Sequence, residues 1–386
     1  MNFSKAVKAA VIIFTGAIAA AGLTACGGIK TAADSPSKSG VKIGFIAALT
    51  GGAAAYGKSQ EEGIRMAAEE INQKGVIPIE LFVEDSKGSP SDAMNVTKRL
   101  IQKKAAVIIG PMTSNEAKAA GPIMQNAKIP SLEISVTAEG ITEIGDYIFR
   151  NSVPESMNIP QTAKKTHRLL GYETAAILYA HDNEQHVTAQ KYFRKTLEEE
   201  GVKIVDVETF GSKDSEYSAQ LTNIENAKPD VVIVCSYYQE GARILKKMRE
   251  MGMNQPVLGD NGFVSPELGK MAGAAADNVY VSSMWSAARD TAATKTFVEN
   301  YTKKYGHAPD QFAAAAYDGV YMAMDAIQRA GSVTDTRKIR DAMAAMKGFN
   351  GVCGTFSFDA KRDPVVDLVL LKMEDGVFLA VGKQSS

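Results

Sequence analysis

The sequence predicts an α/β fold with two similar lobes, each built on a parallel-type sheet that is flanked by helices. Short apolar runs of strand length alternate with helical patterns along most of the chain, which is the order expected of parallel crossover units. The alternation starts again after Pro154, so two series of similar length follow each other. The chain beyond residue 40, about 345 residues, is also longer than one hydrophobic core usually serves.

The first series begins at Val41. An apolar run up to Ile46 suits a strand that is covered on both faces, and apolar residues then recur at helical spacing as far as Ile71. Ser89 and Pro90 mark the start of another helix, with serine as the N-cap and proline in the first turn. The other expected elements are strands at 79–85, 105–110, 129–135 and 147–150, and a helix from Thr113 or Ser114 to Ala127.

The second series repeats the alternation, and the tail breaks it. Three helices follow one another in the tail, and a hairpin then joins 365–373 to 377–382 across a Glu-Asp-Gly turn. The expected strands are at 174–180, 202–210, 230–235, 256–258 and 278–283, and the expected helices are at 156–170, 185–200, 217–227, 240–251, 294–305, 311–330 and 336–346.

We expect the tail to return to both lobes and complete them. The chain then crosses between the lobes three times, near Pro154, Ser283 and Phe356. The predicted division is residues 41–154 with 284–356 in lobe 1, and residues 155–283 with 357–386 in lobe 2.

The N-terminus has the pattern of an export signal. Lys5 and Lys8 precede an alanine-rich apolar stretch at 9–23 that is short for a membrane span. It ends in Leu-Thr-Ala-Cys at Cys26, which resembles the lipobox of bacterial lipoproteins. The resemblance implies a signal peptide at 1–25, a lipid on Cys26, a flexible tether at 26–40 and a location outside the cytoplasm. The alternative is a plain signal peptide with a chance cysteine.

Charge and cysteine content exclude several other classes. Residues 1–25 contain two lysines and no acid, so 41 basic side chains face 44 acidic ones in the remaining chain. This small negative balance gives no reason to expect nucleic acid as a partner. Cys235 lies in an apolar run and Cys353 in a glycine-flanked turn, and we expect them to stay unpaired.

The segment from Gly52 to Ser59 matches the phosphate-loop pattern G-x-x-x-x-G-K-[ST] between a strand and a helix. It makes a nucleotide-binding protein one candidate, with Asp85 as a metal-binding acid. A hydrolase is not indicated, because the chain has no G-x-S-x-G elbow and only four histidines. His181, Asp182 and His186 could suggest a metal site, but the two histidines are five residues apart, a poor spacing for one helical face.

An ordered set of segments points to a family. The segments are IGFIAALTGGAAAYGKSQEEGIRMAAEEIN, GPMTSNEA, IPSLEISVTAEGIT, YIFRNSVPES, VLGDNGFVSPEL and PDQFAAAAYDGVYMAMDAI. From Val41 onward the chain resembles the extracytoplasmic solute-binding proteins of branched-chain amino acid ABC transporters. The resemblance implies the type I periplasmic-binding-protein fold with a three-strand hinge.

The same resemblance implies a function. It predicts a monomer that is not an enzyme, has no cofactor or metal, and closes on an amino acid or small carboxylate for delivery to an ABC permease. A lipid anchor would hold it in the periplasm or at the cell surface. An alternative with the same binding module is a sensor for a signalling receptor.

The resemblance also implies the residues that hold the ligand's polar groups. Ser114, just before a helix, would bind the carboxylate together with free amides of the first helical turn. Thr137 would bind both ends of an amino acid, and Ser135 would offer its backbone carbonyl to the ammonium, with Val136 between them. From the residues alone, Ser114 and Thr137 could equally be helix N-caps.

The remaining predicted contacts form the pocket wall and the second lobe's polar side. By match, the wall is Tyr56, His186, Tyr237 and Phe312. Asn261 stands where the family usually has an acid, and an asparagine gives up the charge-assisted part of a bond to ammonium. The sequence leaves open whether the neighbouring Asp260 supplies that charge or the ligand lacks an amino group. Glu133, in an otherwise apolar strand, is expected either to contact ligand or to pair with a lysine.

Overall fold

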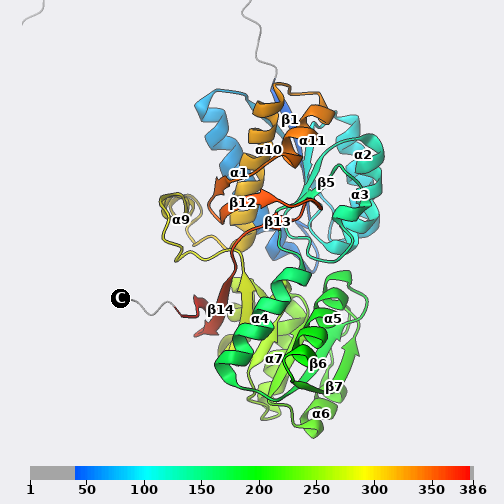
Figure 1. Ribbon diagram of the computed structural model, residues 1–386, viewed down its shortest axis with the longest axis vertical. Helices are drawn as coiled ribbons and strands as arrows, with labels where there is room; N and C mark the ends of the chain where they lie inside the picture. Colours follow the sequence, from blue (N-terminus) through cyan, green and yellow to red (C-terminus); the bar gives the residue numbers. More distant parts are fainter. Residues whose placement is uncertain (1–39, 383–386) are drawn as a thin grey trace, which may run out of the picture. The chain divides into compact units, whose positions relative to one another are not determined.

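The computed structural model describes residues 40–382. The expected signal peptide, nearly all of the tether and Cys26 lie outside this range. The described residues form two main sheets with helices on both faces, which confirms the predicted α/β class (Figure 1). Within this range, no helix combines the length and the apolar character that a membrane span needs.

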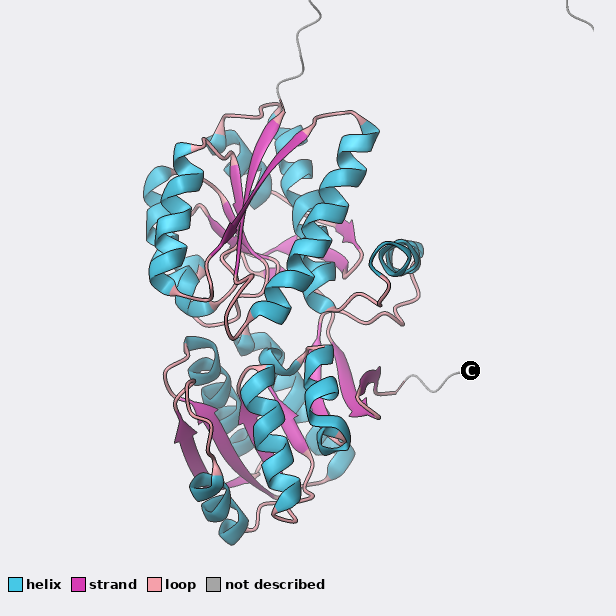
Figure 2. Ribbon diagram, turned by 180° about the vertical axis from the view of Figure 1, so that it is seen from behind, coloured by secondary structure: helices cyan, strands magenta, loops and turns pink. Residues whose placement is uncertain are grey.

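The first sheet forms the centre of lobe 1. Its elements are β1 (Val41–Ala47), α1 (Ala54–Lys74), β2 (Ile79–Asp85), α2 (Pro90–Gln102), β3 (Val107–Ile109), α3 (Ser114–Ala127), β4 (Ser131–Glu133), η1 (Thr142–Ile144) and β5 (Ile148–Arg150). The five strands are parallel in the order β2-β1-β3-β4-β5. Successive side chains point to opposite faces, so Phe45 packs into the cluster with α1 and Ile46 into the cluster with α2 and α3. Figure 2 shows the two helical layers on either side of these strands.

The second sheet forms the centre of lobe 2. Its elements are α4 (Glu155–Leu170), β6 (Thr174–Ala180), α5 (Glu184–Glu199), β7 (Lys203–Phe210), α6 (Ser218–Ala227), β8 (Val231–Cys235), α7 (Tyr238–Glu250), β9 (Val257–Gly259), η2 (Asn261–Phe263), α8 (Pro266–Ala272), η3 (Gly273–Ala276), β10 (Val279–Ser283), β14 (Val369–Glu374) and β15 (Val377–Ala380). The order is β15-β14-β10-β9-β8-β6-β7; β14 runs antiparallel to β10, and β15 runs antiparallel to β14 and so in the direction of the other strands. The predicted C-terminal hairpin therefore extends this sheet.

The tail also supplies elements to lobe 1. They are α9 (Ala292–Tyr305), α10 (Gln311–Ala330), α11 (Thr336–Ala344) and the small antiparallel sheet β11 (Phe349–Gly351), β12 (Gly354–Phe358) and β13 (Pro364–Val365). Helix α10 packs along α1 at very close range (Figure 1). A Cβ atom at Gly63 of α1 would lie 2.1 Å from the carbonyl oxygen of Ala313, so only glycine permits this approach.

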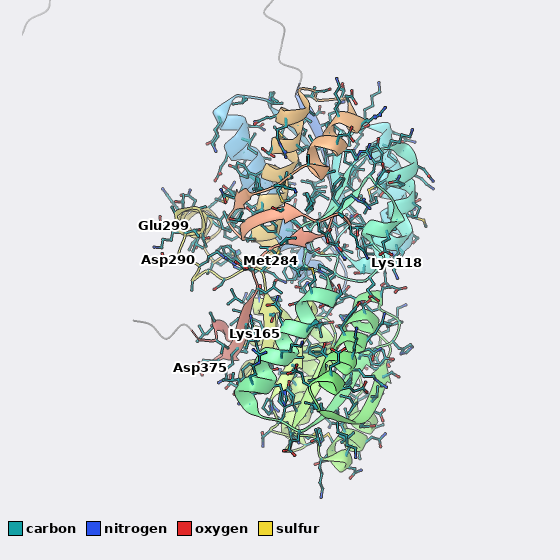
Figure 3. All side chains as sticks on the ribbon, in the orientation of Figure 1. Lys118, Lys165, Met284, Asp290, Glu299 and Asp375 are labelled. Carbon is teal, nitrogen blue, oxygen red and sulfur yellow. The ribbon has the colours of Figure 1, made fainter. Side chains whose placement is uncertain are left out.

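Three chain segments connect the lobes. They run from β5 to α4, from β10 to α9 and from β13 to β14, and Met284 in the second of them is labelled in Figure 3. The predicted division into lobes stays a prediction, but one ion pair favours a later third crossing. The Arg150 Nε atom of β5 lies 2.6 Å from Asp363, so the segment before β13 stays beside lobe 1. We therefore place that crossing between Val365 and Val369 instead of near Phe356.

Two features of the fold were not expected from the sequence. The helix α8 has only 7 residues, too few for a helical pattern to stand out. The strands β11 to β13 are 3, 5 and 2 residues long and lie among glycine and charged residues, which hides their alternation. The expected helix at 336–346 ends at Ala344.

Candidate binding site

Ser114 is the first residue of α3, and Thr113 is its N-cap. The Thr113 hydroxyl accepts from the Glu116 amide, and the Glu116 carboxylate accepts from the Thr113 amide at 3.0 Å, a reciprocal capping box. Ser114 is fully buried, and its Oγ accepts from the backbone amide of Ala138 at 3.2 Å. Capping therefore does not explain Ser114, whose hydroxyl instead ties α3 to the loop that carries Thr137.

Hydrogen bonds to several other segments fix the loop after β4. The Ser135 hydroxyl donates to the Met112 carbonyl at 2.6 Å, and the Val136 carbonyl accepts from the Ser152 hydroxyl at 2.7 Å. The next residue, Thr137, donates its hydroxyl to Oε1 of a buried acid in α4 at 3.0 Å. No helix begins at Thr137, so the alternative that it is an N-cap is wrong.

The four predicted wall residues contact one another. The Tyr56 ring lies 4.5 Å from the Phe312 ring and 5.6 Å from the Tyr237 ring, and the His186 ring lies 4.8 Å from the Tyr237 ring. Tyr237 is half-buried and the other three are buried. Lobe 1 supplies Tyr56 and Phe312, whereas lobe 2 supplies His186 and Tyr237.

The Tyr56 hydroxyl connects the two lobes directly. It donates to the backbone carbonyl of Gly262 and accepts from the backbone amide of Tyr238 at 2.9 Å, and both partners belong to lobe 2. Burial raises the pKa of this phenol well above 10, so it stays protonated and able to donate.

Two buried acids, Asp260 and Glu155, lie beside predicted site residues. Nδ1 of His186 lies 2.6 Å from a carboxylate oxygen of Asp260, and each side chain is about 1% exposed. Glu155, the first residue of α4, is fully buried. Burial, and then the negative charge of Asp260, raise the pKa of the Glu155 carboxyl well above its usual 4.5. The predicted residue set did not include Glu155, because an acid after proline at a helix start is ordinary first-turn chemistry.

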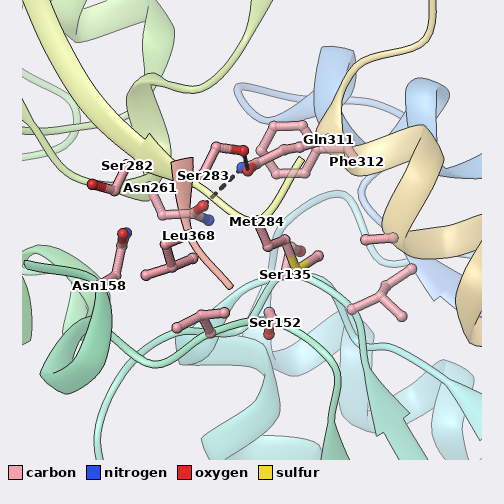
Figure 4. A pocket seen from close by; sticks show the side chains of 13 residues that line it. Ser135, Ser152, Asn158, Asn261, Ser282, Ser283, Met284, Gln311, Phe312 and Leu368 are labelled. Atoms are coloured by element: carbon pink, nitrogen blue, oxygen red, sulfur yellow. Dashed lines mark hydrogen bonds between the residues drawn. The ribbon is translucent and has the colours of Figure 1, made fainter. Parts of the chain in front are cut away.

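Side-chain hydrogen bonds join Asn261 through Gln311 to Ser283, the last residue before the second connection between the lobes. Oδ1 of Asn261 accepts from Nε2 of Gln311 at 2.7 Å, and Oε1 of Gln311 accepts from the Ser283 hydroxyl at 2.9 Å. A small cavity opens beside this chain, and Figure 4 shows the side chains around it. Its lining comprises Ile134, Ser135, Ser152, Val153, Asn158, Asn261, Ser282, Ser283, Met284, Gln311, Phe312, Ala315 and Leu368.

The predicted residues thus fall into two groups. Ser135, Asn261 and Phe312 line the cavity. Ser114, Val136, Thr137, Tyr56, His186 and Tyr237 lie outside its lining, held by the contacts described above. Sequence reasoning missed the other lining residues: some, such as Met284 and Leu368, belong to the crossings, and others, such as Asn158 and Ala315, lie within helices, and no sequence pattern marks either kind.

The stretch that matches a phosphate loop is not a loop. Helix α1 already begins at Ala54, so Gly57, Lys58 and Ser59 lie within it. A Cβ atom at Gly57 would lie 2.0 Å from the Ala48 carbonyl oxygen, so this glycine lets α1 pack closely against the residue that follows β1. The Ser59 hydroxyl donates to Asp310 of lobe 1. A nucleotide site at 52–59 is therefore not favoured.

The remaining candidates for special chemistry have local partners. Asp182 accepts from the backbone amide of Ser212 at 3.0 Å and from its hydroxyl. Across residues 40–382, His, Cys, Asp and Glu side chains do not gather in any group of three that would suit a metal ion. Cys235 and Cys353 are buried and unpaired, as expected.

Comparison with known proteins identifies a family over most of the described chain. A family model described as periplasmic binding protein matches residues 40–376. The chain belongs to this family. A leucine-, isoleucine-, valine-, threonine- and alanine-binding protein of Pseudomonas aeruginosa is 25% identical over 328 residues, which cover 84% of this chain and 87% of the relative.

Solved structures of family members superpose on most of the described chain. The branched-chain amino acid transporter substrate binding protein of Streptococcus pneumoniae, in complex with isoleucine, has a TM-score of 0.83 and 31% identity, covering 88% of this chain and 98% of its own. A solute binding protein of an ABC transporter from Rhodopseudomonas palustris BisB5, in complex with 3,4-dihydroxybenzoic acid, has a TM-score of 0.80 and 27% identity, covering 88% and 96%. These similarities confirm the family resemblance and the type I periplasmic-binding-protein fold.

Proposed function

We propose that this family member is a lipid-anchored, extracytoplasmic solute-binding protein. It captures an amino acid or a related small carboxylate between its lobes and delivers it to an ABC permease. It acts as a monomer, makes and breaks no covalent bond in the ligand, and uses no cofactor or metal.

One observation carries this proposal: the candidate wall is built from both lobes. The hydrogen bonds of Tyr56 to Gly262 and Tyr238 join lobe 1 to lobe 2 at the wall itself. Contacts that exist only when the lobes approach are what allow a ligand to favour the closed form. The names of the relatives, which bind amino acids or aromatic carboxylates, support the same ligand class.

The carboxylate end of such a ligand fits the start of α3. The first amides of a helix are free of intrahelical partners and carry partial positive charge, and a buried hydroxyl stands beside them at Ser114. In the proposed complex Ser114 and Thr137 bind the carboxylate, while the aromatic wall encloses the side chain.

A ligand screen tests this function. Amino acids and small aromatic acids are added one at a time and the unfolding temperature is measured, because binding to the native state alone raises it. For any ligand found, Ser114→Ala should weaken binding by about 1–3 kcal/mol, the penalty of leaving a buried charged group short of a partner. Ser91→Ala, in the exposed first turn of α2, is the matched control. Equal affinity of both variants and the wild type in calorimetry would remove Ser114 from the site.

Anchoring and delivery need their own experiments. Mass spectrometry of the mature N-terminus should find a lipid on Cys26, and Cys26→Ser should release the protein from the membrane fraction. Uptake of the labelled ligand into vesicles that contain the candidate permease should then depend on this protein. The sensor alternative predicts binding with no such uptake.

A further inference from the structure

Glu155 is a buried acid whose hydrogen-bond partners carry no charge. Its Oε1 accepts from the Thr137 hydroxyl at 3.0 Å and from the backbone amide of Asn261 at 3.4 Å. Its Oε2 accepts from Nδ2 of Asn158 at 3.4 Å. The charged neighbour that acts on it is a second carboxylate, Asp260, which is already paired with His186. A buried carboxylate in such surroundings lacks a counter-charge.

A residue bonded to Glu155 carries a further buried hydrogen-bond acceptor that has no donor in the described part of the chain. Oδ1 of Asn158 is buried and has no hydrogen-bond partner among residues 40–382. Asn158 lines the cavity. In Figure 4 its side chain and that of Asn261 lie on the same side of the cavity. A carboxylate without a counter-charge, whose oxygens can each accept a further hydrogen bond, and an amide oxygen without a donor are complementary to a group with several N–H donors and a positive charge.

Glu155 also stands beside the residues assigned to the carboxylate. It is bonded to Thr137 from lobe 1 and to Asn261 from lobe 2, residues that are 18 and 106 positions away in the sequence. In an α-amino acid the carboxylate and the ammonium are attached to one carbon atom, so the groups that bind them must be neighbours. Glu155 meets that requirement, and its contacts reach both lobes.

We infer that Glu155 binds the ammonium group of the ligand, in place of the acid that Asn261 does not provide, and that the ligand is an α-amino acid. This inference rests on the proposed function and narrows its ligand class. It also assigns Asn158 as a second acceptor for the same ammonium. An aromatic carboxylate would leave Glu155 without a counter-charge and the Asn158 oxygen without a donor inside the closed protein, at a cost in affinity.

The experiment compares amino acids with the same molecules lacking the amino group. Leucine is paired with 4-methylpentanoate and isoleucine with 3-methylpentanoate, and 3,4-dihydroxybenzoate is added as an aromatic acid. Any other amino acid that the screen finds is paired in the same way. Affinities are measured by calorimetry with the wild type, Glu155→Gln, Glu155→Asp and Glu267→Gln. Glu267 is an acid in the first turn of α8 that is paired with Lys270, so it serves as the matched control.

The expected result is a loss of about 10- to 100-fold in affinity when the ligand loses its amino group, the range of one hydrogen bond to a charged group. Glu155→Gln should cause a similar loss for the amino acid and little change for its partner without the amine. Glu155→Asp should restore part of the affinity, and Glu267→Gln should change nothing. Unfolding temperatures without ligand show whether each variant is folded.

Two outcomes overturn the inference. One is tight binding of 4-methylpentanoate or 3,4-dihydroxybenzoate at the level of the amino acids, and the other is unchanged amino acid affinity in folded Glu155→Gln. Either result leaves a functioning binding protein for carboxylates, so the proposed function survives. If no amino acid and no carboxylate binds the wild type, the proposed function fails and this inference fails with it.

Discussion

Glu133, in the central part of the first sheet, should make the stability of this protein fall as the pH rises. Its side chain is fully buried in β4, and burial raises the pKa of its carboxyl from 4.5 to about 8. The Ser131 hydroxyl donates to Oε1 at 3.1 Å, whereas Oε2 has no partner among the described residues. Arg150 is opposite in the register of β4 and β5, but its Nε donates to Asp363. Glu133 is not among the residues that line the cavity, and it pairs with no lysine in the part of the chain that the structure describes.

The sign of the effect follows from where the proton is held. The folded protein keeps the Glu133 proton up to about pH 8, whereas the unfolded chain releases it near pH 4.5. Between these values the unfolded state binds fewer protons, so the free energy of unfolding decreases with rising pH, by about 1.4 kcal/mol per pH unit. Over the whole window the loss from this one group approaches about 5 kcal/mol.

Glu133→Gln should remove this part of the pH dependence. We expect the slope of the free energy of unfolding against pH to become less negative by about 1.4 kcal/mol per pH unit between about pH 5 and pH 7.5. Denaturant unfolding across that range measures it, with Glu80→Gln as the control because Glu80 is an exposed acid on β2 of the same sheet. Parallel curves for Glu133→Gln and the wild type would refute the reasoning, since they would mean that Arg150 keeps the acid charged.

Three further predictions follow from contacts between packed elements. Tyr56→Phe removes the hydroxyl that bonds to two backbone groups of lobe 2, so ligand affinity measured by calorimetry should drop by about 1–2 kcal/mol, and an unchanged value would mean that the lobes close without it. Gly63→Ala places a methyl group against the Ala313 carbonyl, so the free energy of unfolding should fall by about 1–3 kcal/mol in denaturant titrations, and no loss would show that α1 and α10 can separate freely. Lys118→Ala breaks an exposed 2.6 Å ion pair between Lys118 of lobe 1 and Glu184 of lobe 2. Ligand affinity should therefore change by less than about 1 kcal/mol, and only at low salt. A larger change that persists in high salt would make this pair a main closing contact.

The helices and strands that the sequence predicted well have local signals at both ends. Helix α10 has the expected bounds because Asp310 accepts from the amides of Phe312 and Ala313 at its start, and Gly331 ends it in the left-handed conformation. The last hairpin turns on Asp375 and Gly376, both with positive φ, which a tight hairpin turn requires.

The candidate site depends on contacts that no local pattern records. The bond between Glu155 and Asn261 joins residues 106 positions apart, and each looks ordinary in its own segment. The phosphate-loop match shows the opposite error. Its letters fit, but α1 starts at Ala54, inside the matched stretch, and Gly57 packs against Ala48. For the candidate site, residue type at a given spacing was therefore informative only where the family resemblance supplied the long-range geometry.

The late position of β14 in the chain has a consequence for biosynthesis. Strand β10 needs β14 as its neighbour, and α1 needs α10, so neither lobe corresponds to an uninterrupted piece of polypeptide. Translation must pass Glu374, the end of β14, before the exposed edge of β10 can be paired. Until then the nascent protein stays incompletely folded, and a truncation just before Val369, which removes β14, should leave an aggregation-prone product.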